Sequence, residues 1–312
     1  MNVPEVKIRV NYNEGKVEPL KEVIEASPSN SLGNAAVLGW RILLDSFNIF
    51  PGPLPGIVLR LGDKALGLIV PLLLFLAWDL VTRYELTPPQ LLPLPKQVAV
   101  TFLDMVRSGE LLVNLKISLL RVTAGFFAGS FTGLVLGTAM GLSKKIESYV
   151  GPLFHSIRQV PLLGWIPLLI LWLGMGETFK VFFIAIGAFY AMTLNTFQGI
   201  RDVPGEYLEV ARVFEYNRLQ LFRKIVFPAA LPSILTGVRI GLSLSWFLLV
   251  GAEFTGASEG IGYSIAWARQ IFQTDVVIAG VFVIGVIGLL MDRVVTLLEG
   301  YLLRWRRKTF TA

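Results

Sequence analysis

Long apolar segments recur along the 312-residue chain and alternate with polar stretches. Six of them reach or approach the ~20 residues that an α-helix needs to cross a bilayer. They do not show the period-two alternation of transmembrane β-strands. The segments lie near residues 65–81, 117–140, 161–176, 178–197, 231–252 and 276–298. This pattern predicts an all-α, polytopic membrane helical bundle with about six spans.

Two shorter segments have the pattern of amphipathic helices. Residues 33–50 repeat large apolar side chains at spacings of three and four, with polar residues between them. This spacing suits a helix that lies in the membrane interface, and equally a collar helix packed on the protein. A Pro- and Gly-rich stretch at 51–56 then breaks the chain. A second amphipathic helix is predicted from Leu94-Pro95 onward, with Val98 and Met105 on one face.

The order of these segments predicts three regions. Residues 1–62 form a polar tail that carries the possible interfacial helix and has no visible signal peptide. Residues 63–305 form the membrane domain, which includes a polar loop at 201–228. Residues 306–312 form a basic tail.

The second span carries a glycine at every fourth position. This spacing places the glycines on one face of the helix, where they permit close approach of a neighbouring helix. A ligand-lined cavity is the alternative use of such a face. The residues are Gly125, Gly129, Gly133, Gly137 and Gly141.

Composition and charge support a membrane protein and give its orientation. The chain is 54% apolar and 16% charged, against roughly 25% charged in soluble domains. With the N-terminus inside, twenty of the 28 Lys and Arg residues fall in inner segments, six in outer segments, and Arg121 and Arg239 within spans. The positive-inside rule therefore predicts that both termini lie in the cytoplasm, with the spans among membrane lipids. The net charge of +6 reflects this topology, so nucleic-acid binding is not expected.

The sequence contains no sign of catalytic or metal chemistry. It has no cysteine, which excludes disulfides and thiolate sites. Its single histidine, His155, is expected in a loop and has no second histidine with which to bind a metal. No phosphate-binding glycine loop and no serine-nucleophile motif occurs. We therefore expect no enzyme activity and no bound cofactor, and any ATP and Mg²⁺ would be used by a partner subunit.

The polar loop between the fourth and fifth apolar segments has a helical pattern of its own. Asp202 and Pro204 are helix-start signals. An apolar stripe follows at i, i+3, i+4 and i+7, made of Tyr207, Val210, Ala211 and Phe214 and flanked by Glu206, Glu209 and Arg212. A second helix is predicted from Arg218 to Val226, ending in the region of Pro228 and Pro232. The pattern fits either docking into a groove of another protein or an elbow packed on its own bundle.

This loop resembles the EAA motif of ABC-importer permeases. The motif reads Glu-Ala-Ala, three residues, Gly, nine residues, Ile, one residue, Leu-Pro, and Glu209, Ala211, Ile225 and Pro228 match it in register. Val210, Glu215 and Phe227 depart from it. Glycine in place of Glu215 would allow a left-handed turn at no cost. Asn217, which tolerates that conformation, is expected to take over the turn.

The resemblance extends over most of residues 60–305 and is closest to permeases of the aliphatic-sulfonate, taurine and nitrate importer family. It is carried by the segments SLLRVTAGF (118–126), PLLGWIPLLILWLGMG (161–176), LTGVRIGLSLSWFLLVGAEF (235–254) and TDVVIAGVFVIGVIGLLMDR (274–293). The resemblance implies a homodimer of this subunit, two cytoplasmic ABC ATPase subunits and an extracytoplasmic binding protein. It also implies that the substrate is an aliphatic sulfonate, or alternatively taurine, nitrate or another small organic anion.

The resemblance further implies a coupling helix in the polar loop. The residues expected to contact or position the ATPase subunit are Glu206, Tyr207, Glu209, Val210, Ala211, Arg212, Phe214, Glu215 and Pro228.

An anion pathway requires hydrogen-bond donors or a positive field inside the membrane. Arg121 and Arg239 are the candidates for the field, and the alternative for each is an arginine that snorkels to the interface. Ser245 and Trp246 are candidate pathway donors. Glu253 would repel an anion, so we interpret it as a structural partner or an outer-gate element.

A secondary transporter or channel is the alternative of a different class. Such proteins usually place ion-coupling acids or an internal repeat within their spans. In this sequence we expect no acid buried in the middle of a span, and no repeat is apparent. The importer permease is therefore the favoured interpretation.

Overall fold

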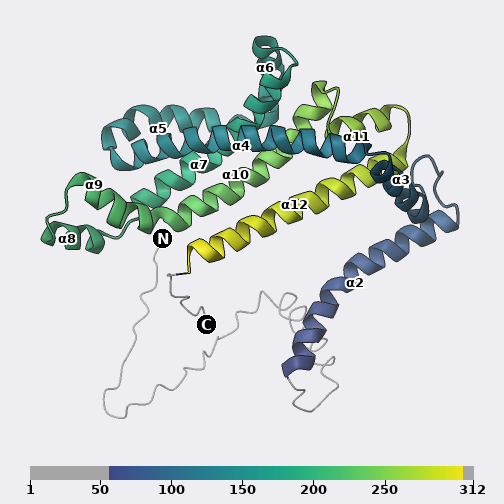
Figure 1. Ribbon diagram of the computed structural model, residues 1–312, viewed down its shortest axis with the longest axis horizontal. Coiled ribbons are helices and arrows are strands. Elements are labelled where there is room, and N and C mark those ends of the chain that lie inside the picture. The colour runs from purple at the N-terminus through teal and green to yellow at the C-terminus, as the bar shows by residue number, and fades with distance from the viewer. Residues whose placement is uncertain (1–55, 305–312) are drawn as a thin grey trace, which may run out of the picture. The chain divides into compact units, whose positions relative to one another are not determined.

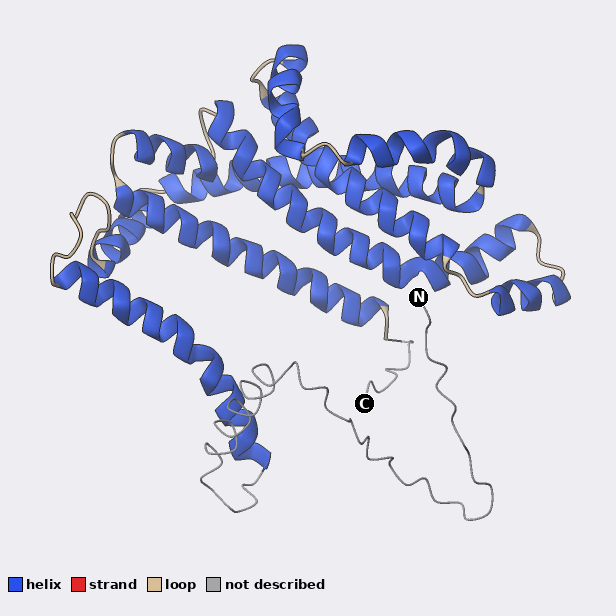
Figure 2. Cartoon of the chain, turned by 180° about the vertical axis from the view of Figure 1, so that it is seen from behind, coloured by secondary structure: helices blue, strands red, loops and turns tan. Residues whose placement is uncertain are grey.

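A computed structural model describes residues 56–304 of the chain, with side chains described from Ile69 onward. Every regular element among these residues is a helix, which confirms the predicted all-α class. The elements are α2 (Gly56–Arg83), α3 (Pro95–Arg107), α4 (Glu110–Leu142), α5 (Lys144–Arg158), η1 (Leu162–Trp165), α6 (Ile166–Leu173), α7 (Glu177–Arg201), α8 (Gly205–Val213), α9 (Arg218–Leu221), η2 (Phe222–Val226), α10 (Phe227–Gly256), α11 (Ile261–Gln270) and α12 (Thr274–Leu302) (Figure 1). Short loops join them, as Figure 2 shows from behind.

Two of the predicted regions lie largely outside the described residues. The helix expected at 33–50 and the basic tail at 306–312 both fall there. Of the tail predicted at 1–62, residues 56–62 belong to the start of α2. The chain from Pro71 onward forms one compact unit.

Four helices within the described residues are long and apolar enough to cross a membrane. These are α4, α7, α12 and the continuous helix Arg218–Gly256 that contains α10. A fifth span is possible if α5 and the η1–α6 segment count as one broken span, bent by 91°. The apolar segment predicted at 65–81 lies in α2, whose side chains are described only from Ile69.

The span predicted at 161–176 was wrong as a single helix. Residues Leu162–Trp165 form a 3₁₀ turn, and α6 ends after eight residues at Gly174, which adopts a left-handed φ of 70°. Proline at position 161 favours an extended preceding residue and so separates α5 from this segment. Figure 1 shows α6 turning away from α5.

Helix α5 was not predicted, because Pro152 and several polar residues interrupt its apolar pattern. It begins at Ser143, whose hydroxyl accepts a hydrogen bond from the backbone N–H of Ile146. His155 therefore lies in a helix and not in a loop. Its ring packs edge-on against Phe154, with 5.5 Å between the ring centres.

The glycine face of α4 is a helix-packing surface. Helices α4 and α7 run parallel, so that Gly125 meets Ile184 and Gly141 meets Ile200. A methyl group on Gly133 would come within 2.7 Å of the carbonyl oxygen of Phe189, and one on Gly129 would overlap the carbonyl oxygen of Ala185. The stripe therefore brings the two helices into close contact, as expected of a packing face.

Helices α10 and α12 extend this layer by antiparallel packing. Gly187 of α7 lies against Leu248 of α10, and Gly199 lies against Ser233. Trp246 of α10 donates a hydrogen bond from its indole N–H to the carbonyl oxygen of Ile284 in α12, at 3.2 Å. Figures 1 and 2 show α4, α7 and α10 side by side. One end of this layer carries α8, and the other carries α11; we call them the α8 end and the α11 end.

The short helices α3 and α11 pack against the start of α12. Val98 and Met105 of α3 are buried in one cluster with Ile261 and Ile265 of α11, which confirms the apolar face predicted for α3. Thr101 also donates a hydrogen bond to the carboxylate of Asp275, at 2.6 Å.

A cluster of charged side chains joins four helices at the α11 end. The guanidinium of Arg121 donates to both carboxylate oxygens of Glu177 at 2.6 and 2.7 Å, and to Glu253 at 2.8 Å. Arg121 and Glu253 are buried, whereas the Glu177 side chain is 62% exposed. Lys180, also buried, donates to Glu177 at 2.7 Å.

The buried carboxylate of Glu253 is fully occupied by donors. The hydroxyl of Ser118 donates to one oxygen, and the backbone N–H of Gly262 donates to the other, each at 2.7 Å. Gly260 has a φ of 118°, and a side chain there would collide with Glu253. The interpretation of Glu253 as a structural partner agrees with these contacts.

We predict that Gly129→Ala destabilises the protein because the methyl group would press on the backbone of α7. Overpacking of this kind costs on the order of 1–3 kcal/mol. The control is Gly285→Ala in α12, where an added methyl would meet nothing within 4 Å. Thermal unfolding of the purified protein should show a lower Tm for the first variant and an unchanged or slightly higher Tm for the second. Equal Tm values would contradict the packing role of the stripe.

We also predict that Arg121→Met destabilises the protein strongly, because it leaves the buried carboxylate of Glu253 without its cation. Breaking a buried ion pair from one side costs about 3–5 kcal/mol. The double variant Arg121→Met/Glu253→Met should recover much of the loss, because the buried carboxylate is then removed together with its cation. The Tm of each variant measures this. A wild-type Tm for Arg121→Met would show that the cluster adds nothing to stability.

Candidate functional site

The loop between α7 and α10 connects two helices of the α4, α7 and α10 layer and carries α8. Helix α7 ends at Arg201, whose side chain pairs with Glu147 of α5. Pro204 then precedes the first residue of α8, Gly205, in the position where a proline costs no helical hydrogen bond. Asp202 and Pro204, the two predicted start signals, therefore lie between α7 and α8.

Helix α8 turns one side to the protein and leaves the other exposed. Ala211 is buried, and Leu208 packs beside Val226 and Ile200. The predicted apolar stripe is therefore split: Ala211 is buried, whereas the other three members are exposed, with Tyr207 and Val210 lining a cleft between α8 and α10. Between 50% and 66% of the surface of Tyr207, Val210 and Phe214 is exposed.

The charged members of the predicted set share this outward side. Glu206, Glu209, Arg212 and Glu215 are all exposed. Val213, which sequence reasoning missed, is 82% exposed. An apolar surface with a charged rim on so short a helix is typical of a contact with another protein.

Glu215 itself forms the left-handed turn after α8, with a φ of 51°. Its N–H donates to the carbonyl oxygen of Arg212, and the N–H of Tyr216 donates to that of Ala211, which is the Schellman pattern of helix termination. The expectation that Asn217 takes over this turn was wrong. Asn217 has extended backbone and caps α9 instead, in a reciprocal pair of hydrogen bonds with Gln220.

The helix that follows does not end near Pro228 and Pro232, contrary to the prediction. It continues from Arg218 to Gly256. A proline ring inside a helix collides with the carbonyl group four residues earlier. Residues Phe222–Val226 accommodate the proline by forming a π-helical turn, in which the N–H of Phe227 donates to the carbonyl oxygen of Phe222.

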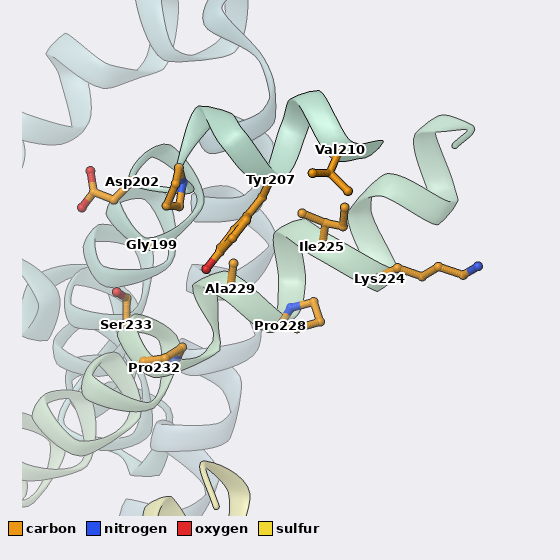
Figure 3. Close-up of a pocket in the computed structure, with 11 residues that line it drawn as sticks. Gly199, Asp202, Tyr207, Val210, Lys224, Ile225, Pro228, Ala229, Pro232 and Ser233 are labelled. Carbon is orange, nitrogen blue, oxygen red and sulfur yellow. The ribbon is translucent and has the colours of Figure 1, made fainter. Parts of the chain in front are cut away.

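A cleft of about 880 Å³ lies between α8 and the start of α10. Figure 3 shows the Tyr207 ring directed from α8 toward Ala229, while Val210 and Ile225 face each other across the cleft. Pro228, Pro232 and Lys224 also line it. The matched motif residues Ile225 and Pro228 thus lie beside α8.

Three of the four candidate pathway residues are used in packing. Ser245 is buried and donates to the carbonyl oxygen of Ile184 at 3.4 Å. Trp246 bonds to α12 as described above, and Arg121 belongs to the buried cluster. Their charges and donors are therefore already occupied, and their role in a pathway stays a prediction.

Arg239 is the pathway candidate that remains accessible. Its side chain is 45% exposed, and its Nε donates to Asp292 of α12 at 2.8 Å. Asp292 was missed, although an acid in one span and a base in another are a recognisable sign of pairing. Neither acid contradicts the expectation of no acid buried in the middle of a span, because Glu253 lies in the last turn of α10 and the Asp292 side chain is 40% exposed.

The described residues contain no group of three His, Cys, Asp or Glu side chains that would hold a metal ion.

Comparison with known proteins places the chain in a transport family. Residues 125–303 match the family described as the binding-protein-dependent transport system inner membrane component. The match includes the α8 loop and all of α7, α10 and α12.

The chain is also similar to individual permeases. It is 42% identical to a putative aliphatic sulfonates transport permease protein of Bacillus subtilis, over 77% of this chain and 87% of that protein. It is 33% identical to the taurine transport system permease protein of Escherichia coli, over 80% of this chain and 90% of that one.

A solved structure supports the fold. A chain in the crystal structure of an amino acid ABC transporter with histidines superimposes with a TM-score of 0.52 at 20% identity, over 66% of this chain and 98% of that chain. The chain therefore belongs to the binding-protein-dependent transport system inner membrane components, as a non-catalytic ABC-importer permease of the sulfonate, taurine and nitrate family.

Proposed function

We propose that the chain forms the transmembrane pathway of an ATP-driven importer for aliphatic sulfonates. The observation that carries this proposal is the 42% identity to a sulfonate permease over most of both chains. Taurine, nitrate and other small organic anions are the alternatives, because permeases named for taurine and nitrate are also similar to the chain. A secondary transporter or channel has no comparable support.

The proposed assembly contains two copies of this chain, two ABC ATPase subunits in the cytoplasm and a binding protein outside. It lies in the inner membrane with both termini in the cytoplasm, as the basic residues favour. Two-fold symmetry would place the pathway on the dimer axis. ATP and Mg²⁺ would be held by the ATPase subunits, and this chain would bind neither.

In this proposal α8 is the coupling helix. Its exposed residues Tyr207, Val210, Val213 and Phe214 would enter a groove of the ATPase subunit, while Glu206, Glu209 and Arg212 form the rim. Closure of the ATPase pair on ATP would move α8 and switch the pathway between its inward- and outward-facing forms. ATP must bind the two forms with different affinity for this switch to occur.

The coupling role predicts that Val210→Asp weakens association with the ATPase subunit. A carboxylate buried in an apolar contact costs on the order of 2 kcal/mol, or about thirtyfold in affinity. Glu209→Lys should weaken it through reversed charge at the rim. The measurement is copurification of the ATPase and its affinity for the permease in nanodiscs.

Two controls separate docking from folding. Leu91→Asp makes a similar apolar-to-acid change at an exposed position in the loop before α3 and should leave association unchanged. Ala211 is buried, so Ala211→Asp should instead lower the Tm of the permease itself. Normal ATPase affinity in both Val210→Asp and Glu209→Lys would remove the coupling assignment.

The substrate is tested with the reconstituted complex in nanodiscs. Binding protein loaded with ethanesulfonate should stimulate ATP hydrolysis several-fold, whereas binding protein loaded with nitrate should not. If only taurine or only nitrate stimulates ATP hydrolysis, that anion replaces the sulfonate as the proposed substrate. The absence of any stimulation by all three would reject this class of substrates.

A further inference from the structure

The Arg239–Asp292 pair lies well inside the two helices that carry it. Arg239 comes about 12 residues after the start of α10, and Asp292 comes about 10 residues before the end of α12. At 1.5 Å per residue, both are about 15–18 Å from the α8 end of their helix and about 25 Å from the other end. The pair is therefore inside the span and not at its edge.

Exposed charges at this depth are costly in contact with lipid. The side chains of Arg239 and Asp292 are 45% and 40% exposed. Ionisable residues in membrane spans almost always face a bundle interior or a water-filled cavity. The exposed half of the pair must therefore meet water or protein in the assembled transporter.

The exposed surface around the pair contains further polar side chains. Thr236, Arg239 and Ser243 are exposed in succession on α10, and each hydroxyl bonds to the backbone of its own helix. The exposed side chains of α4 include Leu120, Phe127 and Phe131, as expected of a face toward lipid. The exposed face of α10 also includes Ile240 and Phe247, so it is the charged pair, and not the hydroxyls, that argues against contact of this region with lipid.

The pair closes one side of a small cleft between α10 and α12. The cleft has a volume of about 250 Å³. It is lined by Leu242, Trp246, Met291 and Val295 together with the two charged residues. Apolar walls with few polar groups are typical of sites for small molecules.

The guanidinium binds Asp292 as a fork. Its Nε lies 2.8 Å from Oδ1, and its Nη2 lies 3.0 Å from Oδ2. Two oxygens of a sulfonate or nitrate would fit the same fork, because arginine matches planar and tetrahedral oxyanions in this geometry. The third nitrogen, Nη1, has no hydrogen bond to any of the described residues.

We propose that Arg239 is an intramembrane contact for the oxyanion group of the substrate, and that Asp292 is a resident counter-anion that the substrate displaces. The proposal rests on the proposed function only in taking the substrate to be a small oxyanion. When the site is empty, Asp292 keeps the arginine neutralised. When the substrate enters, one fork replaces another, and the released carboxylate of Asp292 is left without its cation, so that substrate binding is weak. Such weak binding suits a pathway, because a substrate held tightly would not leave.

Displacement also loosens a link between two helices. The fork is a direct polar contact between α10 and α12 near the α8 end. When the substrate replaces this fork, Asp292 is released and α12 loses this contact with α10. The substrate would thus both occupy the pathway and release one of the contacts that hold it closed.

The experiment uses the permease–ATPase complex in nanodiscs with ethanesulfonate as the probe. The rise in Tm with ethanesulfonate concentration measures binding, and uptake into proteoliposomes measures transport. Asp292→Asn should lower the half-saturating concentration by about tenfold, because the competing carboxylate is gone. Arg239→Gln should abolish the response, and Arg239→Lys should keep part of it because charge remains without the fork.

The double variant Arg239→Gln/Asp292→Asn separates this role from a structural one. Neither charge is left unpaired, so the complex should assemble with a near-wild-type Tm but should neither respond to ethanesulfonate nor transport it. The matched control is Glu147→Gln/Arg201→Gln, which removes another exposed ion pair and should leave the ethanesulfonate response unchanged.

Three results would overturn the proposal. Wild-type uptake by the double variant would make the pair a structural link only, and loss of the second copy from the complex would make it a subunit contact. An ethanesulfonate response that is the same in Asp292→Asn, Arg239→Gln and wild type would exclude the contact. If the wild type imports nitrate in place of sulfonates, the proposed substrate fails, and the same series with nitrate still decides the role of Arg239.

Discussion

The close approach of α4 to α7 is the constraint on which the rest of the structure depends. In a membrane the packing of helices cannot rely on the hydrophobic effect, because lipid is as apolar as the side chains. Helix contact must therefore come from complementary packing, and the five glycines of α4 provide it because they allow α7 to approach closely. Because α7 also packs along α10, its position sets that of α10 and, through Trp246, that of α12.

Helix α7 connects the two ends of the protein as a single rigid element. Its first turn belongs to the charged cluster with Arg121 and Glu253, and its last residue leads into α8. A displacement of α8 would therefore reach the α11 end through one helix held along its length by backbone contacts. The buried cluster suits an anchor for such motion, since separating its charges without compensation is costly. The Arg239–Asp292 fork is half exposed and is a weaker link.

The α8 loop shows how tertiary contacts divide one amphipathic pattern between two uses. Ala211 lies in register with Tyr207 and Phe214, yet it is buried whereas both of them are more than half exposed. Its neighbours Val210 and Val213 stay exposed. One motif position can thus pack within the loop, while the adjacent position stays accessible to the proposed ATPase subunit.

The sequence by itself determined the membrane class, most of the long helices, the glycine contact face and the family, because these depend on composition, periodicity and local spacing. It could not determine the break at 158–166 or the helix through Pro228, since proline disrupts a local pattern while a π turn or a neighbouring helix absorbs the disruption. Nor could it show that Glu215 adopts the left-handed turn, because that cost is borne by the contacts of the whole loop. The partners of Arg121 and Arg239 were decided only by the tertiary structure, since each pair joins residues more than 50 positions apart whose meeting depends on how the helices pack.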